Sequence, residues 1–182
     1  MIRANVFWVP GPWSGRLGIV LRPRGGDWLA DETNSWREAG IDRVVSLLER
    51  DEQAQLDLQG EADAAAASGV EFTSFPIPDR GIPAPDGSAA ELVSHVVEAL
   101  ERGRSVAIHC RQGIGRSALI AGAVLVAEGQ DVATALRTIK ESRGLDVPET
   151  DEQRQWLHDF ASRLTRELPA QHRAAPDGGK RA

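Results

Sequence analysis

Short runs of β-branched and aromatic residues alternate with helical segments along the chain, and this alternation is what most limits the possible folds. The runs are residues 6–9, 17–21, 43–48, 71–77 and 104–109. Strands separated by helices favour a mainly parallel sheet, because each parallel connection needs a long crossover. We therefore predict a single α/β domain, with a mainly parallel central sheet of about five strands flanked by helices.

Helical periodicity is clearest in the second half of the chain. The segment 88–102 repeats apolar residues at the spacing of one helix face, opens with Ser88 and Glu91 at capping-box spacing, and stops at Gly103. Three further helices are predicted over residues 117–128, 132–142 and 150–166. The first of these is apolar on nearly all sides, so it should be buried.

Length and charge set limits on the domain and its partners. The chain has 182 residues and a formal net charge of −6, which suits one globular domain without a general affinity for nucleic acid or an anionic membrane. A single cysteine cannot form an internal disulfide, and no segment has the length of a membrane span or the character of a signal peptide. We therefore expect a cytoplasmic location. Residues 1–168 should form the domain and 169–182 a disordered tail.

The single cysteine, Cys110, lies in the stretch "AIHCRQGIGRSA", directly after a predicted strand and before a predicted helix. Gly113 and Gly115 let the backbone curl between the two elements, so that the free N–H groups at the start of the helix converge on one small space. Such a nest of donors fits a tetrahedral oxyanion, and Arg116 adds a guanidinium that can hold two phosphate oxygens.

The same donors should favour a thiolate at Cys110 and make it a nucleophile. The alternative is that Cys110 is a small buried hydrophobic residue. A structural cysteine would need neither the glycine-containing loop nor the arginine that closes it, so we favour the nucleophile.

The stretch "HCRQGIGRS" resembles the His-Cys-x5-Arg-Ser/Thr signature of the cysteine-based protein tyrosine and dual-specificity phosphatases. The resemblance extends from about residue 15 to residue 165 and is nearest to the atypical dual-specificity type. "ALRTIKESRG" and "DEQRQWLHDF" are also similar to the kinase-associated phosphatase branch. The resemblance implies a phosphatase-like fold and hydrolysis of phosphoric monoesters.

The resemblance also implies a role for each residue of the signature. Cys110 would form a phosphocysteine intermediate, Arg116 would stabilise the transition state, Ser117 would support the leaving thiolate, and His109 would brace the loop. Ser117 has an alternative interpretation as a helix N-cap. The phosphoryl oxygens would be bound by the backbone N–H groups of the loop residues Arg111, Gln112, Gly113, Ile114, Gly115 and Arg116.

Ester cleavage also needs a proton donor. "FPIPDRGIPAPDGSAAE" offers Asp79 and Asp86. Asp86 precedes a predicted helix and is explained by capping, whereas Asp79 follows a predicted strand in a loop. The phosphatase family places its aspartate some thirty residues before the cysteine, and Asp79 fits. We therefore predict that Asp79 is the general acid.

The sequence leaves two roles possible for Gln153. Gln153 either positions the hydrolytic water, as in some relatives, or completes a capping box with Thr150, which we favour.

The expected substrate is a phosphoprotein carrying phosphotyrosine, with phosphoserine and phosphothreonine as further candidates. A phosphoinositide or small phosphate is the alternative, because Arg111 and Ile114 match half of the basic pattern of the lipid phosphatases. The remaining hypotheses are a non-catalytic phosphoprotein-binding module and a sulfurtransferase. We expect no metal and no cofactor.

Overall fold

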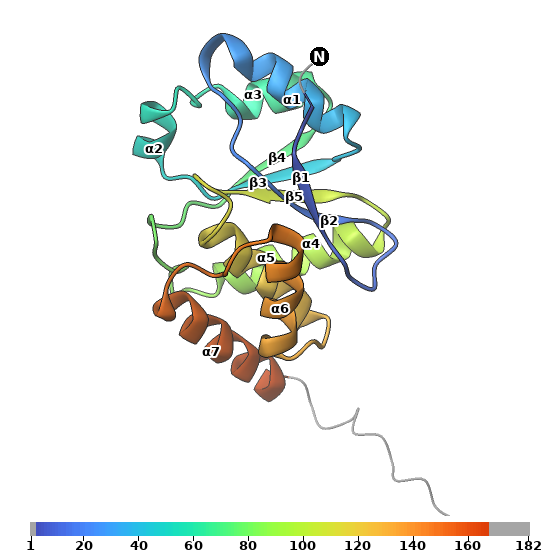
Figure 1. The fold of residues 1–182 in the computed structure, drawn as a ribbon, viewed down its shortest axis with the longest axis vertical. Helices are drawn as coiled ribbons and strands as arrows, with labels where there is room; N and C mark the ends of the chain where they lie inside the picture. Colours follow the sequence, from blue (N-terminus) through green and yellow to red (C-terminus); the bar gives the residue numbers. More distant parts are fainter. Residues whose placement is uncertain (1–2, 168–182) are drawn as a thin grey trace, which may run out of the picture.

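The computed structural model describes residues 3–167 and shows one five-stranded sheet with the order β1-β2-β5-β3-β4 (Figure 1). The strands are β1 Val6–Val9, β2 Leu17–Val20, β3 Arg43–Ser46, β4 Glu71–Ser74 and β5 Val106–His109. β1 pairs antiparallel with β2, and every other pairing is parallel. The prediction of a mainly parallel α/β sheet is confirmed. The tail predicted over 169–182 lies outside the described residues.

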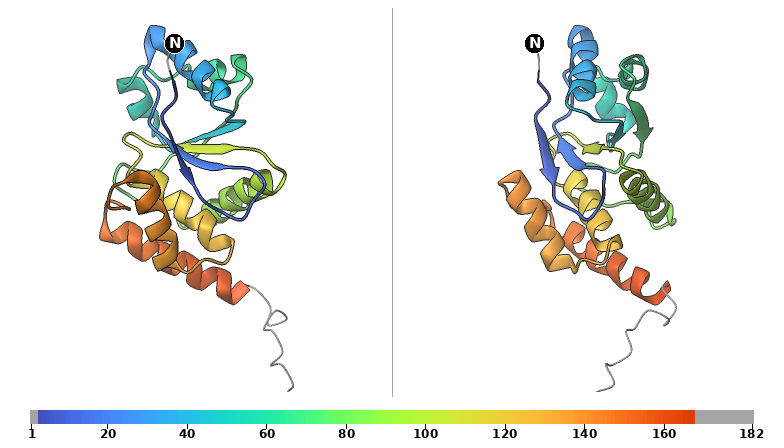
Figure 2. Two further views of the ribbon diagram at one scale, coloured as in Figure 1. Left: turned by 45° about the vertical axis from the view of Figure 1, so that its right-hand side comes forward. Right: turned by 90° about the vertical axis from the view of Figure 1, so that its right-hand side faces the viewer.

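Helices cover both faces of the sheet (Figures 1 and 2). One face carries α1 Leu29–Glu38 and α3 Glu61–Ala67, with the short helices η1 Gly26–Trp28 and α2 Arg50–Gln55 nearby. The other face carries α4 Ser88–Glu101, α5 Arg116–Ala127, α6 Val132–Arg143 and α7 Asp151–Glu167. α5 lies between the sheet and α7 and is buried from Arg116 to Val126, as its apolar sequence predicts.

β1 has the predicted bounds, whereas the other four strands are shorter than the sequence runs that predict them, and β4 shows the reason. The chain continues past Ser74 along the sheet, where the Phe75 N–H donates to the Ser46 carbonyl and the Ile77 N–H donates to the Leu47 carbonyl. Pro76 and Pro78 have no N–H to donate, so the regular ladder ends there. The extra residues still lead the chain along the sheet toward Asp79.

The two predicted capping boxes had different outcomes. At α4 the prediction was wrong, because Gly87 is the N-cap and Asp86 accepts hydrogen bonds from the Ser88 N–H and hydroxyl. At α7 the prediction is confirmed, since Thr150 Oγ1 accepts from the Gln153 N–H and Gln153 Oε1 accepts from the Thr150 N–H. Helices α1, α2 and α3 were given no bounds by sequence periodicity, and α2 and α3 are short.

Among residues 3–167, none of the helices has the length and apolar character needed to cross a membrane. The same residues bring no three histidine, cysteine, aspartate or glutamate side chains together in a group able to hold a metal ion.

Candidate active site

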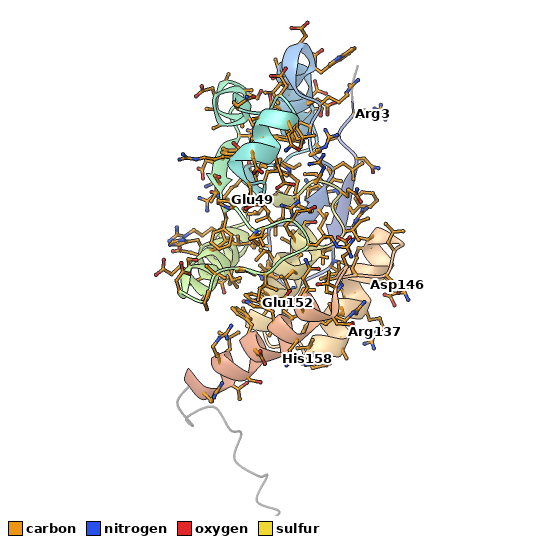
Figure 3. The ribbon with its side chains drawn as sticks, turned by 90° about the vertical axis from the view of Figure 1, so that its left-hand side faces the viewer. Arg3, Glu49, Arg137, Asp146, Glu152 and His158 are labelled. Atoms are coloured by element: carbon orange, nitrogen blue, oxygen red, sulfur yellow. The ribbon has the colours of Figure 1, made fainter. Side chains whose placement is uncertain are left out.

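The carboxyl ends of the parallel strands β3, β4 and β5 meet at one edge of the sheet, which Figure 3 views from outside. Cys110 follows β5 directly, Glu52 lies in α2 after β3, and Asp79 follows β4. Open α/β sheets bind ligands outside the carboxyl ends of their strands, because the loops from neighbouring strands converge there. The topology therefore brings together residues far apart in the sequence.

Residues 110–116, which we call the phosphate-binding loop, wrap around the Cys110 sulfur. Gly113 adopts φ +68°, a left-handed conformation that side chains disfavour, and its N–H donates to Cys110 Sγ over 3.3 Å. The Ser117 hydroxyl lies 3.4 Å from the same sulfur. Within residues 3–167 the backbone N–H groups of Arg111, Gln112, Ile114 and Gly115 have no hydrogen-bond partner in the protein. They remain available to an anion.

Ser117 belongs to the first turn of α5 and is not its N-cap, which is Gly115. The capping interpretation of Ser117 was therefore wrong. Its side chain is buried and has Cys110 Sγ as its neighbour, which leaves the hydroxyl free to interact with the thiol.

The Arg116 guanidinium is buried beneath the site, with only 2% of the side chain exposed. It donates to both oxygens of Glu52 over 2.6 and 2.8 Å, to the Ile77 carbonyl over 2.9 Å and to Asp79 Oδ1 over 3.0 Å. Burial by itself would lower the pKa of Arg116. The hydrogen bonds to Glu52 and the negative charges at Cys110, Glu52 and Asp79 outweigh burial and raise it. Arg116 is thus a fixed cation.

Glu52 is a site residue that sequence reasoning missed. Its only local signal is the capping box at the start of α2, where Glu52 Oε2 also accepts from the Glu49 N–H. Burial would raise the pKa of Glu52, but the hydrogen bonds from Arg116 and from the Glu49 backbone outweigh it and hold the pKa below the usual carboxyl value. The carboxylate therefore stays charged and orients Arg116 bidentately.

The structure separates the two candidate acids. Asp79 lines the same cavity as Cys110, and its side chain is 59% exposed. Asp86 is engaged in capping α4, and the hydrogen bonds from the Ser88 hydroxyl and N–H lower the pKa of this exposed carboxyl. Asp79 is thus the aspartate that the fold places at the site.

His109 is fully buried behind the phosphate-binding loop. Its Nε2 lies 2.8 Å from Glu61 Oε1, although the two groups are not aligned for a hydrogen bond, and the Trp36 ring lies 6.1 Å away. Glu61, at the start of α3, is buried as well. The position of His109 fits the bracing role that the resemblance implies. Sequence reasoning missed Glu61, which adjoins His109 only in the folded chain.

Arg143, at the end of α6, is a third residue that sequence reasoning missed. Its Nε donates to the Gly113 carbonyl over 2.7 Å and Nη2 to the Gln112 carbonyl over 3.5 Å, while the guanidinium lies 3.8 Å from the centre of the Phe7 ring. Burial lowers the pKa of Arg143, and attraction to Cys110 opposes this shift. Arg143 thus holds the phosphate-binding loop from outside and adds a buried cation near the sulfur.

The remaining loop residues line or support a cavity of about 180 Å³ above Cys110. Arg111, Gln112, Gly115 and Arg116 line it, whereas Ile114 packs against the core. The Arg111 guanidinium lies at the half-exposed rim, 3.4 Å from Gln55 Oε1. A cavity of this volume can hold a small anionic group, such as a phosphoryl group, together with the first atoms bonded to it.

Gln153 combines its capping role with contacts at the site. It is fully buried, and its Nε2 donates to the Gly81 carbonyl over 2.9 Å. A Cβ on Gly115 would lie 3.1 Å from the Gln153 amide, so this residue packs directly against the phosphate-binding loop. The capping interpretation is confirmed, and the same side chain also contacts the phosphate-binding loop and the turn that carries Asp79.

The fold and the family match place the chain in the protein tyrosine and dual-specificity phosphatase class. A family model described as "Polymorphic toxin system, DSP-PTPase phosphatase" matches residues 20–130. The chain belongs to this family.

Curated relatives and solved structures agree with this placement. Cyclin-dependent kinase inhibitor 3 of Rattus norvegicus is 28% identical over 135 residues, covering 73% of this chain and 63% of the relative. The human protein of the same name is 26% identical over 139 residues, 75% of this chain and 65% of the relative. The match thus spans less than two thirds of these relatives.

Two solved structures illustrate the likeness of the fold. Kinase associated phosphatase, with serine in place of its catalytic-site cysteine, superposes with a TM-score of 0.83 at 22% identity, covering 92% of this chain and 99% of that one. Tk-PTP in its active form superposes with a TM-score of 0.70 at 29% identity, covering 82% of this chain and 93% of that one.

Proposed function

We propose that this phosphatase hydrolyses phosphoric monoesters of proteins, phosphotyrosine above all, through a phosphocysteine intermediate at Cys110. The observation that carries the proposal is the environment of the Cys110 sulfur. It accepts from the Gly113 N–H, lies beside the Ser117 hydroxyl and shares a cavity with the Arg116 guanidinium. These donors can hydrogen-bond the sulfur of an attacking thiolate, and the same loop offers N–H groups to the phosphoryl oxygens.

In the first step the Cys110 thiolate attacks phosphorus, so that an S–P bond forms while the P–O bond of the ester breaks. Asp79, in its protonated form, gives its proton to the departing oxygen. Arg116 holds phosphoryl oxygens in place, and Glu52 holds Arg116. The charge that develops on the phosphoryl group is thus met by donors already in position.

In the second step a water molecule attacks the phosphocysteine. The Asp79 carboxylate accepts the proton of the water, the S–P bond breaks, and inorganic phosphate leaves. The Ser117 hydroxyl, 3.4 Å from Cys110 Sγ, donates to the sulfur as negative charge returns to it. Asp79 is then protonated and the thiolate restored, so the catalyst is ready for the next turnover.

A phosphoprotein substrate is supported by the names of the relatives. The matched curated proteins are called cyclin-dependent kinase inhibitor 3, and the compared structure is called kinase associated phosphatase. The chain contains no tyrosine that could stack on a phosphotyrosine ring, so the site should also admit phosphoserine and phosphothreonine. A phosphoinositide is a weaker candidate, since of the two loop positions that are basic in lipid phosphatases only Arg111 is basic here.

The test is release of phosphate from phosphotyrosyl, phosphothreonyl and phosphoinositide substrates by the wild type and by Cys110→Ser, in the presence of a metal chelator. We expect the wild type to release phosphate fastest from the phosphotyrosyl peptide and Cys110→Ser to release none. Undiminished activity in the variant would overturn the proposed nucleophile, and preference for the lipid would overturn the proposed substrate. A folded wild type that binds phosphopeptide without turnover would indicate a capture module.

A further inference from the structure

The turn that carries Asp79 has an unusual backbone. The Gly81 N–H donates to the Pro78 carbonyl over 2.8 Å and closes the turn, and Arg80 occupies it with φ +58°. This left-handed conformation suits glycine and is strained for a residue with a long side chain. Strain of this kind persists where surrounding contacts enforce it, and often marks a functional side chain.

The Arg80 side chain has one ionic partner among the described residues. Its Nη1 lies 3.2 Å from Glu149 Oε1, in the segment just before α7. Gln153 Nε2 donates to the Gly81 carbonyl over 2.9 Å from the same end of α7. Two contacts therefore join the Asp79 turn to the start of α7.

Glu149 is not explained by substrate binding. It lines the cavity above Cys110, and a Cβ on Gly115 would lie 3.0 Å from its Oε2. A carboxylate so close to the phosphate-binding loop repels a phosphate dianion. Its charge is offset by Arg80, which reaches it from the Asp79 turn.

We infer that the Arg80–Glu149 ion pair is a clamp that holds the Pro78–Gly81 turn, and with it the Asp79 carboxyl, over Cys110. Arg80 and Glu149 are then positioning residues that act through Asp79. The inference rests on the proposed function, because it concerns the presentation of the general acid. The pair is partly exposed, at 64% for Arg80 and 36% for Glu149, so its loss should reduce the clamped fraction only a few fold.

Two esters separate this role from a merely structural one. Phenolate leaves poorly without a proton, whereas para-nitrophenolate leaves readily, so phenyl phosphate depends far more on Asp79. The parameter kcat/KM reports the steps up to cleavage of the ester. A change in phosphate repulsion alters kcat/KM for both esters alike and cancels in their ratio. The ratio therefore reports the placement of the acid.

The experiment compares wild type, Glu149→Gln, Arg80→Gln and the charge exchange Arg80→Glu/Glu149→Arg. Each single variant should lower the phenyl to para-nitrophenyl ratio of kcat/KM by roughly twofold to fivefold, and the exchange should restore most of it. The matched control is Glu98→Gln, which removes an exposed ion pair between Glu98 of α4 and Arg102 at the C-cap of that helix, and should leave the ratio unchanged. An unchanged ratio in both single variants, or no restoration by the exchange, would overturn the clamp.

Amide hydrogen exchange of residues 79–84 gives a readout independent of turnover. The amide hydrogens of this segment should exchange faster in the single variants than in the wild type. In the double variant Arg80→Glu/Glu149→Arg their exchange should be slower again. A wild type that hydrolyses neither ester would refute the proposed function. The clamp would then stand if the single variants exchange faster, and would fall if they exchange at the wild-type rate.

Discussion

At the scale of single residues, the buried pair of Arg116 and Glu52 links folding stability to the proposed catalysis. Arg116 is the cation at the base of the cavity, and two hydrogen bonds to Glu52 fix its plane. Removing one partner of a buried pair leaves the other charge poorly compensated. Glu52, which orients the cation that we propose binds substrate, is therefore also a determinant of folding free energy.

Glu52→Gln tests this coupling through its pH dependence. The free energy of unfolding should fall by up to about 3 kcal/mol at neutral pH, since the amide keeps only part of the bonding. The folded pKa of Glu52 lies below its ordinary value of 4.5, so its ionic contribution is complete above that pH and is lost as the pH falls through the folded value.

Urea unfolding of both proteins from pH 7 to pH 3 measures the difference. It should be constant above about pH 5 and shrink below it. A difference that grows as the pH falls would contradict the assigned direction.

Asp79→Asn tests the acid. Turnover of phenyl phosphate should fall by about 10²–10⁴, because an amide cannot transfer the proton. Inhibition by inorganic phosphate should be no weaker than in the wild type, since the phosphate-binding loop is untouched. Asp86→Asn is the control and should retain activity, because Asp86 only caps α4. Loss in Asp86→Asn with full activity in Asp79→Asn would reverse the assignment.

At the scale of elements, the phosphate-binding loop is supported by helices that follow it in sequence. α5 begins at Arg116 and is buried between the sheet and α7, whereas α6 ends with Arg143 gripping the carbonyls of Gly113 and Gln112. The loop is therefore held from several sides, which keeps its N–H groups aimed at the cavity.

Arg143→Met tests the support from α6. Hydrogen bonds from charged donors are worth about 1.5–3 kcal/mol, so the inhibition constant of inorganic phosphate should rise about tenfold or more. Arg137→Met is the matched control, because Arg137 lies exposed on the same helix (Figure 3) and its guanidinium donates to the Thr134 hydroxyl of that helix. Equal inhibition constants in the wild type and Arg143→Met would show that the hydrogen bonds from Arg143 do not determine the shape of the loop.

The elements also show what the sequence could predict. Local sequence patterns predict the strands, the four later helices, Cys110 and Asp79. Hydrophobic periodicity indicates the strands and helices, and nearby glycines and prolines mark the loops that carry the two site residues. Glu52, Glu61 and Arg143 carry no comparable signal. They reach the site through the parallel pairing of β3 with β5 and the packing of α3 and α6, which is decided by tertiary contacts. The capping box predicted at Ser88 failed because Gly87 is the N-cap of α4 and the Ser88 hydroxyl donates to Asp86 instead.

At the scale of the whole molecule, the site joins both layers of helices across the sheet edge. Arg116 of α5 contacts Glu52 of α2, and His109 of β5 adjoins Glu61 of α3. A ligand that engages Arg116 and the loop should therefore stabilise the folded chain as a unit. Binding to the native state alone adds free energy by mass action.

Inorganic phosphate tests this stabilisation. At a hundred times its dissociation constant it should add about 2.7 kcal/mol, which raises Tm by roughly 5–10 °C in a domain of this size. Sodium chloride at equal ionic strength is the control and should have little effect. Thermal unfolding followed by circular dichroism gives both values, and equal Tm values in the two salts would show that the loop does not bind phosphate.

The central claim is that Cys110 carries the phosphoryl group during turnover, and its most direct measurement is mass analysis of acid-quenched Asp79→Asn during hydrolysis of para-nitrophenyl phosphate. This ester needs little help from the acid, whereas release from cysteine needs Asp79 as base, so the intermediate should accumulate. We predict that the peptide containing Cys110 gains the mass of one phosphoryl group, and that Cys110→Ser/Asp79→Asn gains none. An unmodified Cys110 in a variant that is still turning over would contradict the account.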